Sequence, residues 1–379
     1  MIKILFLSKR AYMRRDALND RYGRLYQIPT KLAAAGARVD AILASYRMGL
    51  PKPFSTVSDG VTWRSYTLPI SLRPYLNAID TAVAKADVVV VSSDCFHVAL
   101  GGWIKRKFNK PLVVDLYDNY ESFGMARLPF VKTYYHRGLR AADLICCNGS
   151  MLEQYAKERA GAVETIVLRS TIEDGAFCKK PKHLCRKALG LSETQKLVGI
   201  AGGLTADRGI GHIYEACRNL VNQGFELGLV LAGGADARWP IPNDIWVKYL
   251  GDLPHEKMVD FYNAVDLNVI QVRADDFGQY CFPQKADEIL ATGAPFIAAN
   301  VGELAIVFRD YPEILFNPDN VVEIQTVIQS QLSSPISVSV EIETWARSVQ
   351  CLYNKLEEVF RKRAGSSAKG TKTARLTGM

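Results

Sequence analysis

The stretch LVGIAGGLTADRGIGHIYEA (197–216) places an apolar run, a glycine pair and an amphipathic segment one after another. The apolar run predicts a strand that is buried on both faces, as in a parallel sheet. Gly202 and Gly203 allow close approach to the backbone, and we expect a helix to begin near Asp207. Free N–H groups at a helix start attract anions, and Arg208 adds a full positive charge. Taken alone, the stretch fits an anion site and an ordinary strand–helix turn equally well.

A second stretch, FGQYCFPQKADEILATGAPFIAA (277–299), predicts a helix between two buried strands. Pro283 suits the first turn of a helix, and Gly293 suits its end. Lys285 and Glu288 lie three residues apart and therefore share a face near the start of this helix. A lysine beside a helix start would attract a diphosphate, and a glutamate one turn further could accept hydrogen bonds from ribose hydroxyls. Such a pair is usually a surface ion pair, but its place in a nucleotide-type sheet favours a binding role.

Short apolar runs alternate with longer amphipathic segments throughout the chain, which is typical of βαβ units around a parallel sheet. We expect strands at 2–7, 38–44, 87–92, 111–117 and 143–149 in the first half, and at 197–203, 228–234, 246–251, 266–272, 295–299 and 314–317 in the second. The fold class is therefore α/β, with two Rossmann-like, doubly wound domains facing a cleft. We expect these parts: an acceptor-side domain (1–170), a linker (171–193), a nucleotide-sugar domain (194–340), a C-terminal helix that could cross back (341–362) and a disordered basic tail (363–379).

The composition excludes several classes of protein. The 379 residues carry a net charge of +8, and no apolar run is long enough to predict a transmembrane helix. The eight cysteines form no C-x-x-C pair and no zinc spacing, so we expect reduced thiols, no metal and a cytoplasmic protein. Five arginines near the N-terminus predict a basic face that could meet anionic lipid or a phosphorylated acceptor; they are Arg10, Arg14, Arg15, Arg21 and Arg24. No nucleic-acid motif accompanies them, and we expect no nucleic-acid partner.

The second half resembles the nucleotide-sugar domain of GT-B glycosyltransferases of family 4 (glycosyl transferases group 1). Five pieces follow one another in the family's order: VGIAGGLTADRGI, GLVLAGG, GDLPHEKMVDFYNAVDLNVI, FPQKADEILATGAP, and VGELAIV with NPDN. The resemblance implies a UDP- or GDP-sugar donor, no cofactor, no bound metal and retention of configuration. It implies donor contacts from Gly202, Gly203, Arg208, Tyr280, Lys285 and Glu288.

Some family residues are replaced in this chain. Gly203 stands where the family often has Arg, and Arg208 stands at its Lys. Tyr280 stands at the first of two paired glutamates, so Asp275 or Asp276 could take over its contact with the donor sugar.

The first half resembles the family's acceptor domain more loosely, through LAAAGARVDAIL, KPLVVDLYDN and GLRAADLICCNGSMLEQY. Tyr117 stands where the family has a histidine. Three residues at or just beyond strand ends are candidates for the catalytic group that faces the acceptor: Asp118, His97 and Asp94. A buried, hydrogen-bonded histidine is the competing interpretation for His97, and a capping residue is the competing interpretation for Asp118.

The resemblance implies a glycosyltransferase that moves a sugar to a hydroxyl of a glycan or lipid-linked glycan. We therefore expect a role in polysaccharide biosynthesis at the inner face of the membrane. Three alternatives stay open. The first is a catalytically degenerate GT-B protein that binds a nucleotide sugar or a protein partner. The second is a GT-B epimerase. The third is a Rossmann oxidoreductase, against which the missing G-x-G-x-x-G at the first strand argues.

Overall fold

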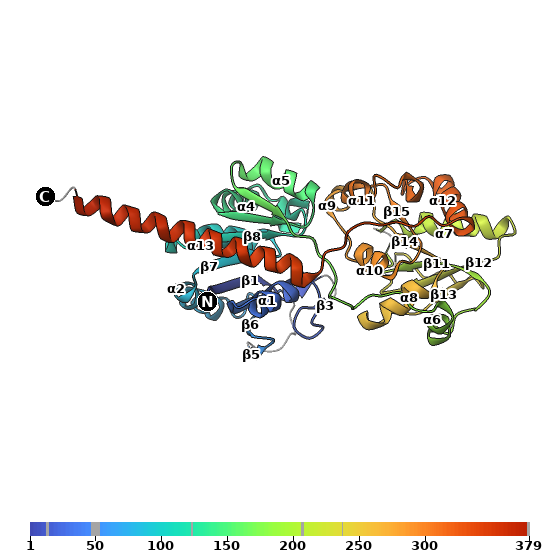
Figure 1. Cartoon of the computed structure of the whole chain (residues 1–379), viewed down its shortest axis with the longest axis horizontal. Helices are drawn as coiled ribbons and strands as arrows, with labels where there is room; N and C mark the ends of the chain where they lie inside the picture. The colour runs from blue at the N-terminus through green and yellow to red at the C-terminus, as the bar shows by residue number, and fades with distance from the viewer. Residues whose placement is uncertain (13–14, 47–53, 123, 206–207, 237, 377–379) are drawn as a thin grey trace. The chain divides into compact units, whose positions relative to one another are not determined.

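The computed structural model describes residues 1–12, 15–46, 54–122, 124–205, 208–236 and 238–376. The chain forms two compact units, each with its own sheet and core (Figure 1). The first unit contains Met1–Ser170 together with the C-terminal residues from Trp345. The second unit contains Thr171–Thr344.

The first unit is built on an eight-stranded sheet in the order β10-β9-β8-β7-β1-β4-β6-β5. All neighbours are parallel except the last pair, β6 and β5, which forms an antiparallel hairpin at one edge. The strands are β1 (Lys3–Lys9), β4 (Arg38–Ser45), β5 (Phe54–Ser58), β6 (Val61–Thr67), β7 (Val88–Ser92), β8 (Leu112–Leu116), β9 (Leu144–Cys147) and β10 (Glu164–Val167). A two-residue pair, β2 (Ala11–Tyr12) with β3 (Arg15–Asp16), lies outside this sheet.

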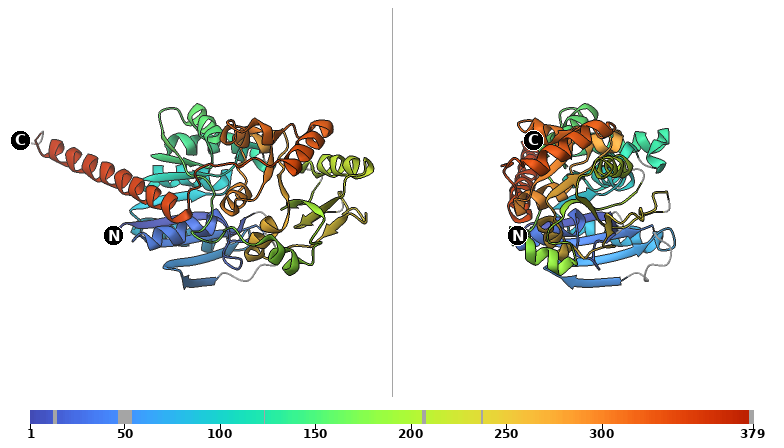
Figure 2. Two further views of the ribbon diagram at one scale, coloured as in Figure 1. Left: turned by 45° about the vertical axis from the view of Figure 1, so that its right-hand side comes forward. Right: turned by 90° about the vertical axis from the view of Figure 1, so that its right-hand side faces the viewer.

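Helices flank this sheet, and the last of them comes from the far end of the chain (Figure 2). They are α1 (Arg24–Ala34), α2 (Leu72–Lys85), α3 (Cys95–Phe108), α4 (Pro129–Ala141), α5 (Ser150–Ala160) and α13 (Trp345–Leu376). The apolar stripe expected on the last helix is buried in the core of the first unit; it consists of Trp345, Val349, Leu352, Leu356 and Val359. The C-terminal helix therefore belongs to the unit that the chain left at Ser170, and it extends past residue 362, where the composition predicted a disordered tail.

The second unit has six parallel strands in the order β13-β12-β11-β14-β15-β16. Numbered along the chain this order is 3-2-1-4-5-6, the order of dinucleotide-binding sheets. The strands are β11 (Lys196–Ala201), β12 (Leu227–Ala232), β13 (Val247–Tyr249), β14 (Leu267–Ile270), β15 (Phe296–Ala299) and β16 (Leu315–Phe316). The helices are α6 (Lys182–Leu189), α7 (Ile210–Asn222), α8 (Met258–Ala264), α9 (Asp276–Tyr280), α10 (Lys285–Thr292), α11 (Gly302–Val307) and α12 (Val321–Ser333). Helix α6 lies inside the segment expected as a linker, with Cys185 and Arg186 buried.

All eleven strands expected from apolar runs are present, within a few residues of their predicted bounds. Three further strands of the two sheets were missed, and each lies at or near a sheet edge. The residues of β5 are mostly exposed, those of β6 alternate between buried and half-buried, and β10 is a short edge strand. Edge strands lack the continuous apolar runs that mark central strands of a parallel sheet.

Two of the five arginines expected on a basic face are in fact buried in ion pairs. Arg24 is fully buried, and its Nη2 lies 2.6 Å from Oδ1 of Asp115 at the end of β8. Arg10 is also buried, and its Nε lies 2.7 Å from Oδ2 of Asp16. Arg15 lies over the ring of Tyr22, and Arg14 lies outside the described residues. The basic face predicted from these residues is therefore wrong for Arg10 and Arg24.

The ion pair between Arg24 and Asp115 connects α1 to the centre of the sheet. Ser92 at the end of β7 donates a hydrogen bond to Asp115 Oδ2 at 2.7 Å, and Arg24 also donates to the carbonyl oxygen of Leu168. The buried carboxylate thus has a charged partner and a second donor, as a desolvated charge requires.

We predict that Arg24→Ala lowers the free energy of unfolding by about 3–5 kcal/mol, because it leaves the Asp115 carboxylate buried without its charged partner. The double variant Arg24→Met/Asp115→Leu should recover most of that loss, since neither buried charge remains. Urea denaturation of the three proteins measures both effects. A loss below about 1 kcal/mol for Arg24→Ala would show that the pair is not a structural anchor.

Candidate functional site

The carboxyl ends of β11 and β14 form the switch point of the second sheet, where the chain's strand order reverses. Ligands of open α/β sheets bind outside the carboxyl ends at such a point. Gly202 directly follows β11, and Gln271 directly follows β14. The Gln271 amide is buried, and its Nε2 donates to the carbonyl oxygen of Gly209 at 3.4 Å. Gly209 is the N-cap of α7, so the start of this helix also lies at the switch point.

Two glycine turns meet at this edge. Gly202 and Gly233 both have positive φ angles, +116° and +129°, and a Cβ on Gly233 would lie 1.9 Å from the carbonyl oxygen of Gly202. Leu204 N donates to the carbonyl oxygen of Gly234 at 2.9 Å and holds the two turns together. Gly203 differs, because a Cβ there would meet nothing within 4 Å. Gly202 and Gly233 are thus required by the fold, whereas the space above Gly203 is open.

Two cations converge beside these turns. Lys285, the first residue of α10, donates from Nζ to the carbonyl oxygen of Ala201 at 3.0 Å. Arg208 lies with its guanidinium carbon 4.5 Å from the centre of the Phe277 ring. Burial and, to a lesser extent, the charge of Arg208 lower the pKa of Lys285 to about 8, against opposing effects from Cys281 and Glu288. A low pKa on a lysine beside a second cation marks a place where positive charge is held without a full counter-charge.

Glu288 is buried one turn further along α10, at the centre of a hydrogen-bond network. Its Oε1 accepts from His255 Nε2 at 2.9 Å and from Gln284 Nε2 at 3.1 Å. Its Oε2 accepts from the Tyr262 hydroxyl at 2.7 Å. A carboxylate offers about four acceptor positions, so three protein donors leave room for one more hydroxyl. The sequence had predicted Glu288 but not His255 or Tyr262, which lie 33 and 26 residues away.

Other residues predicted at the donor site have clear places in the fold. Tyr280 is the partly buried last residue of α9, five positions before Lys285. Asp275 caps α9 by accepting a hydrogen bond from Gly278 N at 2.9 Å. Asp207, where a helix was expected to start, lies outside the described residues, and α7 begins at Ile210.

The corresponding edge of the first unit lies at the carboxyl ends of β1 and β7. Asp94 caps α3, and its Oδ1 accepts from the backbone N–H of His97 at 2.9 Å and lies 2.8 Å from His97 Nδ1. The other ring nitrogen of His97 lies 3.2 Å from the Tyr75 hydroxyl. Burial alone would raise the pKa of Asp94, but the charge and hydrogen bonds of His97 hold it below its ordinary value. Both ring nitrogens of His97 are thus engaged inside the protein, which favours the structural interpretation of that residue.

Lys9 is a residue of this edge that the sequence analysis missed. It ends β1, its backbone N–H donates to the Ser93 hydroxyl at 2.7 Å, and its Nζ lies 5.7 Å from the centre of the Tyr117 ring. Burial lowers the pKa of Lys9, and the charges of Asp94 and Asp118 partly offset that effect. Asp118 Oδ1 accepts a hydrogen bond from the N–H of Asn119, the next residue, at 2.9 Å. The structure therefore brings Lys9, Asp94 and Asp118 together at one edge.

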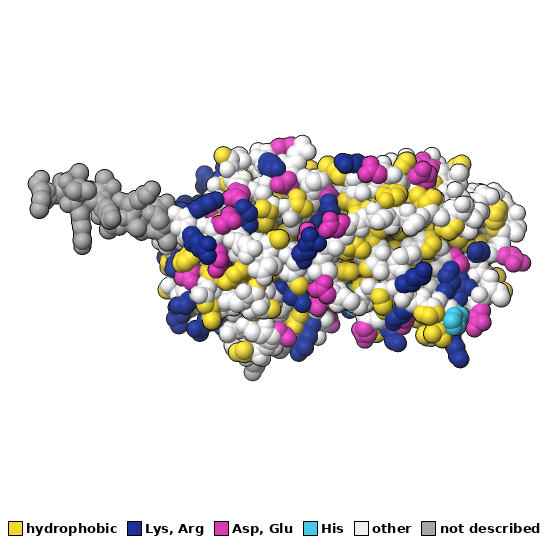
Figure 3. Space-filling view, in the orientation of Figure 1, with side chains coloured by type: hydrophobic (Ala, Val, Ile, Leu, Met, Phe, Trp, Pro, Cys, Tyr) yellow, Lys and Arg dark blue, Asp and Glu magenta, His cyan; other side chains and the backbone are white. Residues whose placement is uncertain are grey.

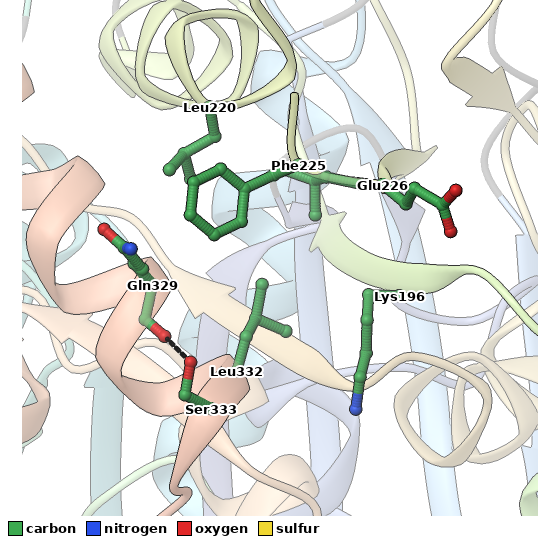
Figure 4. A pocket seen from close by; sticks show the side chains of 8 residues that line it. Lys196, Leu220, Phe225, Glu226, Gln329, Leu332 and Ser333 are labelled. Atoms are coloured by element: carbon green, nitrogen blue, oxygen red, sulfur yellow. Dashed lines mark hydrogen bonds between the residues drawn. The ribbon is translucent and has the colours of Figure 1, made fainter. Parts of the chain in front are cut away.

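One hollow of the second unit lies at the opposite, amino end of its strands. It has a volume of about 400 Å³ and is lined by apolar side chains such as Leu220, Phe225 and Leu332, with Lys196 and Glu226 at its margin (Figure 4). None of the predicted site residues lines it. Among the described residues, no cluster of three or more His, Cys, Asp or Glu side chains could hold a metal ion. No helix in the described ranges is long and apolar enough to cross a membrane.

Solved structures with the same architecture span the whole chain. Sucrose-phosphate synthase from Thermosynechococcus elongatus is 18% identical, with a TM-score of 0.69 and full coverage of both chains. HepE from Anabaena in complex with UDP-glucose is 17% identical, with a TM-score of 0.65 over 97% of this chain and 100% of HepE. The α,α-trehalose 6-phosphate synthase from Burkholderia multivorans is 14% identical, with a TM-score of 0.61 over 100% of this chain and 98% of the synthase.

The chain has the GT-B fold. The predicted fold class of two Rossmann-like domains is thereby confirmed. No protein-family model and no curated protein sequence matches the chain, so the likeness to GT-B proteins rests on structure.

We predict that Gly233→Ala lowers the free energy of unfolding by about 2–4 kcal/mol, because its Cβ would collide with the Gly202 carbonyl at a positive φ angle. Gly203→Ala is the matched control in the neighbouring turn, and it should change stability by less than about 0.5 kcal/mol. Chemical denaturation of both variants checks this difference. Equal losses would mean that the two turns are not in contact as described.

Proposed function

We propose that this GT-B protein is a glycosyltransferase that binds a UDP- or GDP-sugar on its second unit and transfers the sugar to a hydroxyl acceptor. The observation that carries the proposal is the meeting of Arg208 and Lys285 with an open glycine turn at the switch point. Two cations without a full counter-charge, beside the start of α7, suit a diphosphate. HepE, which shares the fold, has been solved with UDP-glucose, and this supports a nucleotide-sugar ligand.

Each donor-side residue has a role in this proposal. Arg208 and Lys285 neutralise the diphosphate, whose negative charge grows as the sugar leaves, and this stabilises the transition state. The open backbone at Gly203 lets the phosphates approach closely. Glu288 accepts a hydrogen bond from a ribose hydroxyl, while His255 and Tyr262 fix its orientation. Tyr280 stands beside the sugar in place of an acidic residue.

The acceptor side of the proposal rests on the first unit. Asp118, beside Lys9 at the carboxyl edge, is the candidate that deprotonates the acceptor hydroxyl, and Asp94 with His97 positions this edge. We propose a glycan or lipid-linked glycan as acceptor, retention of configuration without a metal ion, and a place at the inner face of the membrane.

A second candidate function is a degenerate GT-B protein that binds a nucleotide sugar, or a protein partner, without transferring the sugar. It is favoured by the engagement of Asp94 and His97 with each other and by Tyr280, which replaces an acidic residue. Turnover separates the two candidates. Release of UDP from UDP-sugars, even by slow hydrolysis, favours the enzyme, whereas binding without any turnover across a panel of donors and acceptors favours the degenerate protein.

We predict that Arg208→Ala weakens UDP or GDP binding by roughly 10- to 100-fold, because a charge-assisted contact to phosphate is lost. Glu288→Ala should weaken binding as well, and Glu288→Gln should weaken it less, since it still accepts from Tyr262. Calorimetric titration measures each affinity, and Lys248→Ala, on an exposed strand of the same unit, is the control. Unchanged affinity in both alanine variants would refute the site.

We also predict that binding depends on pH through Lys285. Because its pKa is about 8 without ligand and a bound diphosphate favours the ammonium, binding takes up a proton above pH 8. The affinity for UDP should fall by up to about tenfold per pH unit above pH 8. Calorimetry in two buffers of different ionisation enthalpy measures the proton uptake. Lys285→Arg stays charged and should show no such fall; a flat profile for the unmodified protein would contradict the prediction.

A further inference from the structure

Helix α4 of the first unit exposes aromatic and cationic side chains on one face. Phe130 is 61% exposed, Tyr134 is 51% exposed, and Leu128 just before the helix is 41% exposed. Arg137 and Arg140 are also exposed. The guanidinium carbon of Arg137 lies 5.5 Å from the centre of the Tyr134 ring, and Nε of Arg140 donates to the carbonyl oxygen of Arg159 at 3.2 Å. Large apolar side chains grouped on a surface are uncommon unless that surface meets a partner.

The opposite face of α4 is fixed against the unit and cannot rotate outward. Val131, Tyr135 and Leu139 are buried, and Gly138 packs so tightly that a Cβ there would lie 2.3 Å from the carbonyl oxygen of Val98 in α3. In Figure 1, α4 lies in the first unit next to α5. The exposure of Phe130 and Tyr134 is therefore built into the packing of α3 and α4.

The charge of this face has one sign. The sequence contains no Asp or Glu between Glu121 and Asp143. Glu121 is mostly buried and is bound by Lys132 and His136, and Asp143 is paired with Lys105. In the part of the chain that the structure describes, Arg137 and Arg140 have no carboxylate within ion-pair distance. Glu158, the exposed acid of α5, is paired with Arg159.

Helix α3, against which α4 packs, also exposes an aromatic side chain beside a cation. Trp103 is 38% exposed, and Lys107 Nζ lies 4.6 Å from the centre of its ring. Lys107 is also within 3.5 Å of Asp80, so part of its charge is balanced. Rings that keep a polar edge beside lysine and arginine are the residues that settle at the boundary between lipid headgroups and acyl chains.

The chain topology connects this face with the acceptor edge of the same unit. The parallel strands β8 and β9 are joined through α4, so α4 begins at the carboxyl edge and runs back to the amino edge. Leu128 and Phe130 at its start are thus on the edge that holds Lys9 and Asp118. A surface bound by α4 would bring a lipid-linked hydroxyl toward that edge.

We propose that the exposed face of α4, defined by Leu128, Phe130, Tyr134, Arg137 and Arg140, docks on an anionic lipid surface. The aromatic rings enter the interface, and the two arginines contact phosphate headgroups. This surface replaces the N-terminal arginines, two of which are buried, as the membrane-facing part of the protein. It deepens the proposed function, because it supplies the place where a lipid-linked acceptor would be met.

The test is co-sedimentation of the full chain with vesicles of phosphatidylcholine, with and without phosphatidylglycerol. The unmodified protein should bind only the anionic vesicles and should be released in roughly 0.5 M NaCl. Arg137→Gln/Arg140→Gln should weaken binding by roughly 20- to 30-fold, given the attraction of each cation to an anionic surface. Phe130→Ser/Tyr134→Ser should weaken binding and leave the residual binding more sensitive to salt.

The matched control is Ile245→Ser/Lys248→Gln, which removes a more exposed apolar residue and a lysine from the second unit. It should bind vesicles like the unmodified protein. Every variant keeps the basic C-terminal segment from Arg361, which could itself bind anionic vesicles. Unchanged vesicle binding in both α4 variants would therefore overturn the proposal and indicate that segment or another surface. Absence of vesicle binding in the unmodified protein would also overturn it and leave a protein partner for this face.

A melting temperature and a UDP titration for each variant separate these outcomes from the proposed function. The α4 variants should melt like the unmodified protein and bind UDP with unchanged affinity, because α4 lies outside the donor-binding unit. Absence of UDP binding in the unmodified protein would refute the nucleotide-sugar site. Binding of α4 to anionic vesicles would then still be supported, but without the proposed function.

Discussion

The backbone contact between Gly202 and Gly233 is the constraint on which the geometry of the proposed donor site depends. A Cβ on Gly233 would lie 1.9 Å from the Gly202 carbonyl oxygen, so the turns after β11 and β12 can approach only as glycines. This approach fixes the end of β11, whose last carbonyl, that of Ala201, accepts the hydrogen bond from Lys285. The position of the lysine charge therefore follows from the packing of two turns that carry no charge themselves.

At this carboxyl edge of the second sheet, burial opposes positive charge. Lys285 is held where burial lowers its pKa, its one described protein acceptor is a neutral carbonyl, and Arg208 adds repulsion. Glu288 lies one turn away but accepts hydrogen bonds from His255, Gln284 and Tyr262. Its carboxylate therefore offsets little of the repulsion between Lys285 and Arg208. Two neighbouring cations without a counter-charge repel each other, so a bound anion stabilises this site strongly. A site arranged in this way before the ligand binds is electrostatically preorganised, as the transfer of a group from a diphosphate requires.

The sequence predicted the central strands, and it pointed to Lys285 and Glu288 at the carboxyl edge of the second sheet, because both leave local signals. Continuous apolar runs mark β7 and β11, and Lys285 and Glu288 lie in one short helix motif. Contacts between distant residues leave no such signal. The partner of Arg24 is 91 residues away, so a buried structural arginine could not be told from a surface one. Lys9 was missed for the same reason, since its neighbours Ser93 and Tyr117 come from other strands. The edge hairpin of β5 and β6 was missed because its strands are only half covered.

The net charge of +8 can be interpreted only when the position of each cation in the structure is known. Arg10 and Arg24 serve the fold, because a carboxylate meets each of them inside the first unit. Arg208 and Lys285 share an edge where no carboxylate neutralises both. Arg137 and Arg140 remain at the surface of α4, and Arg137 lies over the exposed ring of Tyr134. Of these three pairs, only Arg208 with Lys285 and Arg137 with Arg140 carry positive charge that an anionic ligand could neutralise. They lie in different units, as expected if one binds the soluble anionic donor and the other the surface that presents the acceptor.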